Sequence, residues 1–262
     1  MRIIVCVKQV PDTTEIKTNP ETGTLIRDGV PSILNPDDAN ALEQALQIKD
    51  SQPDTEVVVV TMGPPQAVGM LEECLAMGAD DAVLLSDRAL GGSDTWATSN
   101  AVAAGIRKLG EFDILMAGRQ AIDGDTAQVG PQIAEKLGIP QITYMRSFAM
   151  DGDYITVERA LEDGYEVLRV KKPCMLTAIK ELNTPRYMSI AGIRKACRSE
   201  VKIWNADDIK VDKTVVGLKA SPTNVFKSFT PKPKAPGIRV AGDTPKEKAD
   251  NLIEAFKEKH II

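Results

Sequence analysis

Four consecutive valines, Val57 to Val60, constrain the fold of this chain more than any other feature. A β-branched run that does not alternate with polar residues is typical of a strand buried on both faces. Both faces are buried where helices cover them, as in parallel sheets built from βαβ units. Similar apolar runs occur at residues 2–7, 82–85, 112–117 and 173–179, and helical patterns separate those in the first half. The sequence therefore predicts an α/β fold with a parallel sheet and helices on both faces.

The pattern changes in the second half of the chain. Residues 142–145 predict one more strand, and residues 153–159 and 165–171 predict the two strands of a β-hairpin. Residues 182–198 show no clear periodicity, and residues 199–220 are ambiguous. We expect the apolar run at 173–179 to rejoin the main sheet.

The C-terminal part predicts an arm. Residues 221–236 are rich in Pro and Lys and cannot bury a core of their own. Thr244-Pro-Lys-Glu247 is a capping box that begins a helix, and a disordered tail has no need of such a terminus. We expect an α/β domain over residues 1–185, including a small β-hairpin at 153–171, and an extended C-terminal arm with a terminal helix over residues 201–262.

Composition excludes several classes of function. The net charge of −5, with dispersed Lys and Arg, argues against a nucleic-acid surface. No run of eighteen apolar residues occurs and residues 2–7 are too short for a signal peptide, so we expect no membrane insertion. Four cysteines without a C-x-x-C pair suit a reducing compartment, and we expect a cytoplasmic protein. Histidine-based catalysis would have to use His260 alone, so redox or group-transfer chemistry must come from a bound cofactor.

The stretch from Gly118 to Pro131 is the main candidate for binding that cofactor. It follows a buried strand and precedes residues 132–138, which predict a helix that ends at a glycine. Loop N–H groups and the positive end of a helix dipole together attract anions such as phosphate. The sequence thus predicts an anion-binding loop at the carboxyl end of a strand, where open parallel sheets bind ligands.

Side chains of this loop fit such a role. Three glycines would let the backbone approach a ligand without an obstructing Cβ: Gly118, Gly124 and Gly130. Thr126 and Gln128 could donate to phosphate oxygens, and Arg119 brings the only full positive charge. An ordinary acidic turn over residues 123–125 with an N-cap explains the same residues, and neither G-x-G-x-x-G nor G-x-x-x-x-G-K-[ST] is matched.

The sequence predicts two further helix starts. Asn35-Pro-Asp-Asp38 combines an N-cap Asn, Pro at the first helical position and acids in the first turn. Ser93 is the expected N-cap of the helix before residue 112. Cys6 to Lys8 closes the first strand and is a further candidate for the ligand edge.

Two motifs resemble a known family. Residues 118–130 are similar to the nucleotide-binding loop of the beta subunit of electron transfer flavoproteins. Residues 157–168, followed by 173–177, resemble the signature of the same subunits, and the resemblance extends along almost the whole chain. It implies a Rossmann-like nucleotide-binding domain in a heterodimer with the electron transfer flavoprotein alpha subunit.

The resemblance also implies the residues around the nucleotide. They belong to the ends of two strands, one helix start and the glycine-containing loop: Cys6; Asn35, Pro36, Asp37 and Asp38; Met62; Gly118, Arg119, Gln120, Ala121, Ile122, Asp123, Gly124, Asp125, Thr126, Ala127, Gln128 and Val129. Among these, the Asn35 side chain and the amides of residues 124–129 are expected to make most of the polar contacts.

Partner contacts are implied in two places. Residues 186–200 correspond to the recognition loop of the family, which docks on an acyl-CoA dehydrogenase or enoyl-CoA reductase through an aliphatic anchor at Ile190. The arm is expected to contact the alpha subunit. The implied partner-binding residues are Arg186, Tyr187, Ile190, Phe226 and Phe229.

The resemblance leaves the nucleotide open between FAD and AMP. Residues 123–131 and 8–13 are similar to the branch of the family that binds FAD here, and AMP is the alternative. That branch includes electron-bifurcating proteins, which use NADH to reduce ferredoxin or flavodoxin together with a CoA ester. We expect this activity only in complex with partners.

Two other classes of function share this architecture. An adenylating enzyme would need more positive charge around a triphosphate and metal-holding acids, whereas this loop offers Arg119 and two acids. A small-molecule sensor module would not need the arm over residues 221–262. Flavin absorbance of the purified protein would distinguish an electron transfer flavoprotein subunit from an adenylating enzyme and from a sensor module.

Overall fold

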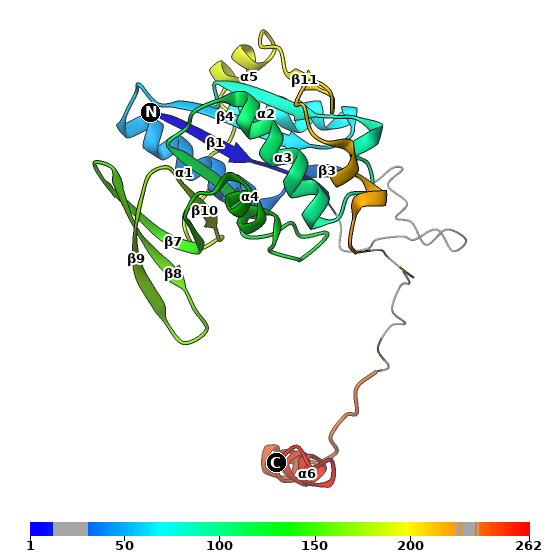
Figure 1. Cartoon of the computed structure of the whole chain (residues 1–262). Coiled ribbons are helices and arrows are strands. Elements are labelled where there is room, and N and C mark those ends of the chain that lie inside the picture. Colours follow the sequence, from blue (N-terminus) through cyan, green and yellow to red (C-terminus); the bar gives the residue numbers. More distant parts are fainter. Residues whose placement is uncertain (13–30, 224–225, 227–233, 235) are drawn as a thin grey trace. The chain divides into compact units, whose positions relative to one another are not determined.

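The structure, a computed structural model, describes residues 1–12, 31–223, 226, 234 and 236–262 (Figure 1). The chain divides into two compact units, with the described residues up to 226 in the larger and residues 234 and 236–262 in the smaller. Each unit is considered by itself.

Within the described residues, a nine-stranded sheet in the order β11-β5-β4-β1-β6-β10-β7-β8-β9 forms the centre of the larger unit. Seven neighbouring strands are parallel and the last two pairings are antiparallel. The strands are β1 Arg2–Cys6, β4 Glu56–Met62, β5 Asp81–Leu85, β6 Ile114–Gly118, β7 Gln141–Asp151, β8 Tyr154–Ala160, β9 Tyr165–Lys171, β10 Cys174–Ala178 and β11 Lys202–Trp204. A separate pair, β2 Gln9–Pro11 and β3 Ser32–Leu34, is antiparallel.

Helices cover both faces of the parallel part. Val57 and Val59 pack into one core with α1 and α2, and Val58 and Val60 pack into a second core with α3 and α4. All four valines are fully buried, which confirms the inference from the valine run. The helices of this unit are α1 Pro36–Ser51, α2 Val68–Met77, α3 Thr95–Leu109, α4 Val129–Leu137 and α5 Ile190–Ala196.

The larger unit extends further along the chain than the expected limit at residue 185. β11 pairs with β5 at the edge of the sheet, and Ala206, Ile209 and Val216 are buried in the core on the α3 and α4 side. The ambiguous segment 199–220 therefore contributes to the main sheet and its core rather than to an arm. Short apolar segments of this kind show no periodicity because only single residues face inward.

Local details also differ from the sequence-based expectations. Asp94 rather than Ser93 caps α3, since its carboxylate accepts the Ala97 N–H at 2.9 Å. Ser93 instead bonds backbone groups of Leu90 and Gly217. β7 runs well beyond the predicted 142–145 because it also pairs with β8, whereas the hairpin of β8 and β9 is as predicted.

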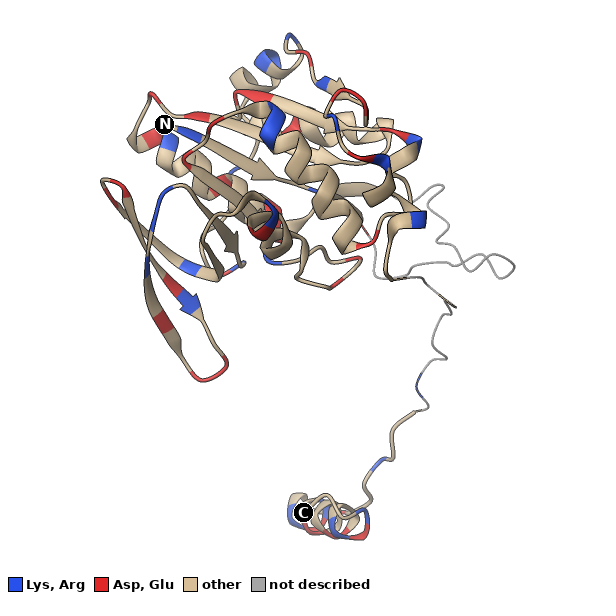
Figure 2. Cartoon of the chain, in the orientation of Figure 1, with Lys and Arg blue, Asp and Glu red and all other residues tan. Residues whose placement is uncertain are grey.

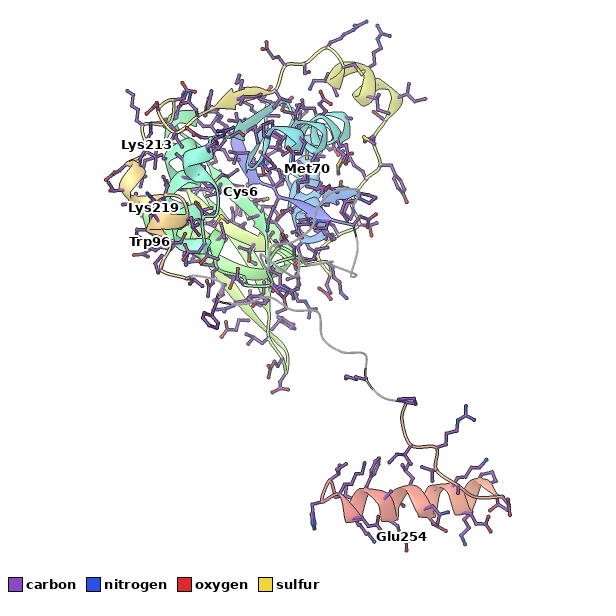
Figure 3. All side chains as sticks on the ribbon, turned by 90° about the vertical axis from the view of Figure 1, so that its right-hand side faces the viewer. Cys6, Met70, Trp96, Lys213, Lys219 and Glu254 are labelled. Carbon is purple, nitrogen blue, oxygen red and sulfur yellow. The ribbon has the colours of Figure 1, made fainter. Side chains whose placement is uncertain are left out.

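The smaller unit contains α6, Pro245–Glu258. Thr244 and Glu247 form the predicted capping box, with reciprocal bonds between side chains and backbone. None of the helix residues is buried, and side chains surround the helix (Figure 3). Within this unit, Leu252, Ile253 and Phe256 are 37–44% exposed.

Acidic and basic residues are interspersed over the described ribbon of the larger unit (Figure 2). No helix in the described part of the chain is long and apolar enough to cross a membrane.

Candidate functional site

The strand order reverses between β1 and β6. The chain leaves β1 through α1 to reach β4 on one side, whereas β5 connects through α3 to β6 on the other side of β1. In open parallel sheets, the connections at such a switch point diverge and leave a crevice at the carboxyl ends of the strands, where ligands bind. The loops after β1 and β6 flank this switch point, and the region between them, termed the crevice, is the candidate site.

The implied nucleotide residues converge on this edge of the sheet. Cys6 ends β1, Met62 ends the neighbouring β4, and Gly118 ends β6. Asn35 lies immediately before α1, whose first residue is Pro36. These segments are far apart in the sequence, and the parallel register brings them to one side.

Asp38 ties the ends of β1 and β6 together. Its Oδ1 accepts the Gly118 N–H at 2.8 Å, and its Oδ2 accepts the Lys8 N–H at 2.9 Å. The residue is 6% exposed. Burial raises the pKa of Asp38 to about 7, although hydrogen bonds from Gly118, Asn35 and Lys8 act in the opposite direction.

Asn35 is also buried and holds the first part of the loop. Its Nδ2 donates to the Gln120 carbonyl at 2.8 Å, and its Oδ1 accepts the Ile122 N–H at 3.1 Å. Asn35 stands at the N-cap of α1, as predicted, but its side chain does not cap that helix. It positions the loop instead, and a contact from its side chain to a nucleotide stays a prediction.

The second part of the loop offers backbone donors. Asp125 and Ala127 have φ of 53°, with Thr126 outside the left-handed region between them. Such alternation is typical of anion-binding backbone concavities. Among the described residues, no acceptor is found for the N–H groups of residues 126–130, which lead into the N-terminus of α4. This segment therefore fits a phosphate group.

The three glycines of the loop differ in what a side chain at each position would contact. A Cβ at Gly118 would lie 2.5 Å from the Asp38 carboxylate and 2.6 Å from α1 backbone, and one at Gly130 would meet Met175 and Thr177 at 3.0 Å. These two glycines serve packing within the chain. A Cβ at Gly124 meets nothing within 4 Å, so only Gly124 borders open space.

Four charged side chains at the crevice form two pairs. The Lys8 Nζ lies 2.6 Å from Asp123 Oδ1, and the Arg119 Nε lies 3.4 Å from Asp37 Oδ2. The sequence analysis expected Arg119 to bring the only full positive charge at the loop. The structure adds a second one, the Lys8 ammonium. The Asp125 carboxylate accepts a hydrogen bond from Gln120.

Sequence reasoning missed one polar contributor. The Thr95 hydroxyl, at the start of α3, donates to Gln128 Oε1 at 2.9 Å. This bond joins the N-terminal ends of α3 and α4 at the loop. The one feature of the sequence that indicates a role for Thr95 is its position at the beginning of a helix, directly after a strand and a loop.

The implied recognition loop is fastened to the larger unit at both ends of its exposed part. Arg186 donates to Glu43 at 2.8 Å and to Asp50 at 2.8 Å, which binds it to α1. A Cβ at Gly192 would lie 1.9 Å from the Ala76 carbonyl oxygen, so α5 packs directly on α2. Between these anchors Tyr187 is 96% and Ile190 is 87% exposed.

These contacts separate the implied partner residues. Tyr187 and Ile190 are available to another protein, whereas the Arg186 guanidinium is already engaged within the chain. Phe226 is fully exposed, and Phe229 lies outside the described residues.

Comparisons with known proteins identify the family of this chain. A family model described as "Electron transfer flavoprotein domain" matches residues 22–209. The chain is 60% identical, over the full length of both chains, to the caffeyl-CoA reductase-Etf complex subunit CarD of Acetobacterium woodii. It is also 60% identical to the electron transfer flavoprotein subunit beta of Clostridium acetobutylicum, again over both full lengths. The acryloyl-CoA reductase electron transfer subunit gamma of Anaerotignum propionicum is 50% identical over both full lengths.

The chain therefore belongs to the electron transfer flavoprotein family, and its full-length similarity to these proteins makes it a beta-type subunit.

We expect Gly124→Leu to lower nucleotide content severalfold while the free energy of unfolding changes by less than about 1 kcal/mol, because the new side chain enters open space. Gly118→Ala should destabilise the fold by about 1–3 kcal/mol because its Cβ meets α1. Gly164→Leu, also in open space but in the distant hairpin turn, is the matched control. Bound nucleotide and urea denaturation are measured for each variant. Full nucleotide content in Gly124→Leu would exclude the loop as the phosphate site.

We expect the stabilising contribution of Asp38 to fall as pH rises. Its folded pKa of about 7 lies above the ordinary value of 3.8, so the protonated form stabilises the fold fully below about pH 4, and this contribution is lost as pH rises through about 7. The free energy of unfolding of the wild type relative to Asp38→Asn should thus decrease between pH 5 and 7, by on the order of 1–3 kcal/mol, and level off above that range.

Urea denaturation at several pH values measures this difference. Asp87→Asn is the control, because backbone hydrogen bonds from Ala89 and Ala206 hold the pKa of Asp87 below its ordinary value. Its difference from wild type should be flat over the same range. A flat difference for Asp38→Asn as well would contradict the prediction.

Proposed function

We propose that this chain is the beta subunit of a cytoplasmic heterodimeric electron transfer flavoprotein that binds FAD in the crevice between β1 and β6. The observation that carries the proposal is the set of loop amides over residues 126–130, which lack acceptors among the described residues and lead into α4 at the switch point. Gly124 adds open space beside them.

Charge compensation within the loop supports a dinucleotide in this proposal. Lys8 compensates the charge of Asp123, and Gln120 donates to Asp125, so the two loop acids are not left to repel a diphosphate. Met62 and Cys6, both partly buried, lie at the neighbouring strand ends. AMP is the alternative ligand, and it would use the same amides.

In this proposal the chain binds and orients the nucleotide, and a bound flavin would supply hydride and single-electron transfer chemistry. The activity we propose is electron bifurcation: NADH is oxidised, and its electrons reduce ferredoxin or flavodoxin as well as a CoA ester through an acyl-CoA dehydrogenase or enoyl-CoA reductase. The printed names of two relatives, a caffeyl-CoA reductase complex subunit and an acryloyl-CoA reductase subunit, support the CoA-ester part.

Partner contacts divide between the two units. We assign the alpha subunit to the arm and to α6, whose apolar residues are partly exposed within the smaller unit. The CoA-ester dehydrogenase or reductase is assigned to the surface around Tyr187 and Ile190. α5, which begins at Ile190, packs on α2 at Gly192.

Flavin and AMP quantitation on the purified heterodimer tests the nucleotide. Two flavins per heterodimer are expected, and one flavin with one AMP would establish the alternative. The electron-transfer proposal is tested anaerobically, where NADH should reduce ferredoxin only while the CoA-ester acceptor is also present. Reduction by an acyl-CoA dehydrogenase without any reaction with NADH would make the protein an ordinary electron carrier.

We expect Ile190→Ala to slow electron transfer to the CoA-ester partner by about tenfold, because a large exposed side chain at the centre of a docking surface contributes strongly to binding. Flavin content and the free energy of unfolding should not change, since Ile190 is 87% exposed. Ile203→Ala, at a 56% exposed position on β11, is the control. Normal turnover with Ile190→Ala would remove the docking surface from the proposal.

A further inference from the structure

Lys8 is placed at the crevice by its own backbone. It follows β1 by two residues, its N–H donates to Asp38 at 2.9 Å, and its carbonyl accepts the Asn35 N–H at 2.9 Å. Both partners also hold the loop after β6. The base of the Lys8 side chain is therefore fixed relative to the loop on the opposite edge of the crevice.

The Lys8 ammonium crosses to that loop. Its Nζ donates to Asp123 Oδ1 at 2.6 Å, between residues 115 positions apart in the sequence. The Asp123 side chain is only 9% exposed, whereas that of Lys8 is 47% exposed. A nearly buried carboxylate without its cation is costly, so Asp123 strongly favours keeping Lys8 beside it.

The ammonium retains donors for a ligand. An ammonium group has three N–H donors, and within the described residues Asp123 accepts one hydrogen bond from it. The other cation of the loop, Arg119, lies 3.4 Å from Asp37, and its side chain is 35% exposed against 47% for Lys8. Lys8 is thus the more exposed of the two cations, and among the described residues two of its three donors are unused.

We propose that Lys8 supplies positive charge to the phosphate groups of the bound nucleotide and that Asp123 is a positioning residue, which holds the Lys8 ammonium across the crevice. This inference rests on the proposed nucleotide site and assigns a role within it to a residue outside the implied set. It also gives Asp123 a function in an anion-binding loop, where an acid by itself would repel the ligand.

The test uses the full-length chain in its heterodimer, stripped of nucleotide and titrated with FAD, AMP and adenosine. Lys8→Met should weaken FAD and AMP about tenfold or more, because it removes a charge-assisted hydrogen bond. Adenosine, which has no phosphate, should bind equally well to both proteins. Asp123→Asn should weaken FAD and AMP about threefold to tenfold, and the double variant should be no weaker than Lys8→Met, because Asp123 acts through Lys8.

Lys49→Met is the matched control, since the Lys49 Nζ also lies 2.6 Å from a carboxylate, that of Asp80, away from the crevice. It should leave all three affinities unchanged. Unchanged FAD and AMP affinity in Lys8→Met would overturn the proposal, and so would tighter binding by Asp123→Asn, since the carboxylate would then only repel phosphate. Equal weakening of adenosine would indicate collapse of the crevice and would also overturn it.

The proposed function fails by a different result. If the wild-type heterodimer binds none of the three ligands, or if Gly124→Leu binds FAD normally, the nucleotide site itself lies elsewhere. Wild-type binding that Gly124→Leu abolishes and Lys8→Met leaves intact would overturn the role of Lys8 alone.

Discussion

The carboxylate of Asp38 lies between the ends of two neighbouring strands and accepts one backbone N–H from each, from Lys8 after β1 and from Gly118 at the end of β6. Both strands end at the switch point of the sheet, where the chain must leave in opposite directions. A divergence of this kind opens a crevice, and a buried acceptor shared by the two edges fixes its width. Gly118 has no side chain because α1, which carries Asp38, occupies that volume.

Charge compensation explains how a loop with two acids can accept an anion. Asp123 and Asp37 are each paired with a cation that comes from the opposite edge or from the loop itself, and Asp125 accepts from a neutral amide. The attraction for a ligand then comes from backbone N–H groups and from the α4 terminus, which contribute positive potential without a mobile side chain. Such an arrangement favours binding of a polyanion that contacts several amides over binding of an anion that forms a single ion pair.

The parallel core could be predicted from the sequence because a strand buried on both faces must be apolar throughout, as Val57 to Val60 are. The glycine-containing loop was equally visible, and so was the capping box at Thr244. α5 and β11 were not, since both are short and carry exposed apolar residues such as Ile190 and Ile203, and contacts with α2 and β5 hold them in place. The Lys8–Asp123 pair joins positions so distant in the chain that no local pattern records it.

The position of β11 has a consequence for the exposed loop that precedes it. The segment between β10 and β11 begins at a strand beside β6, in the interior of the sheet, and ends at the edge strand beside β5. Both of its ends are thereby built into one rigid layer, and Arg186 and Gly192 fasten it again in between. A protein that docks on Tyr187 and Ile190, as proposed, would lose little entropy in ordering this surface, because folding has already ordered it. The same attachment would make the proposed docking surface a continuation of the strand next to the crevice, so that the sheet would set the distance from a docked partner to the loop after β6.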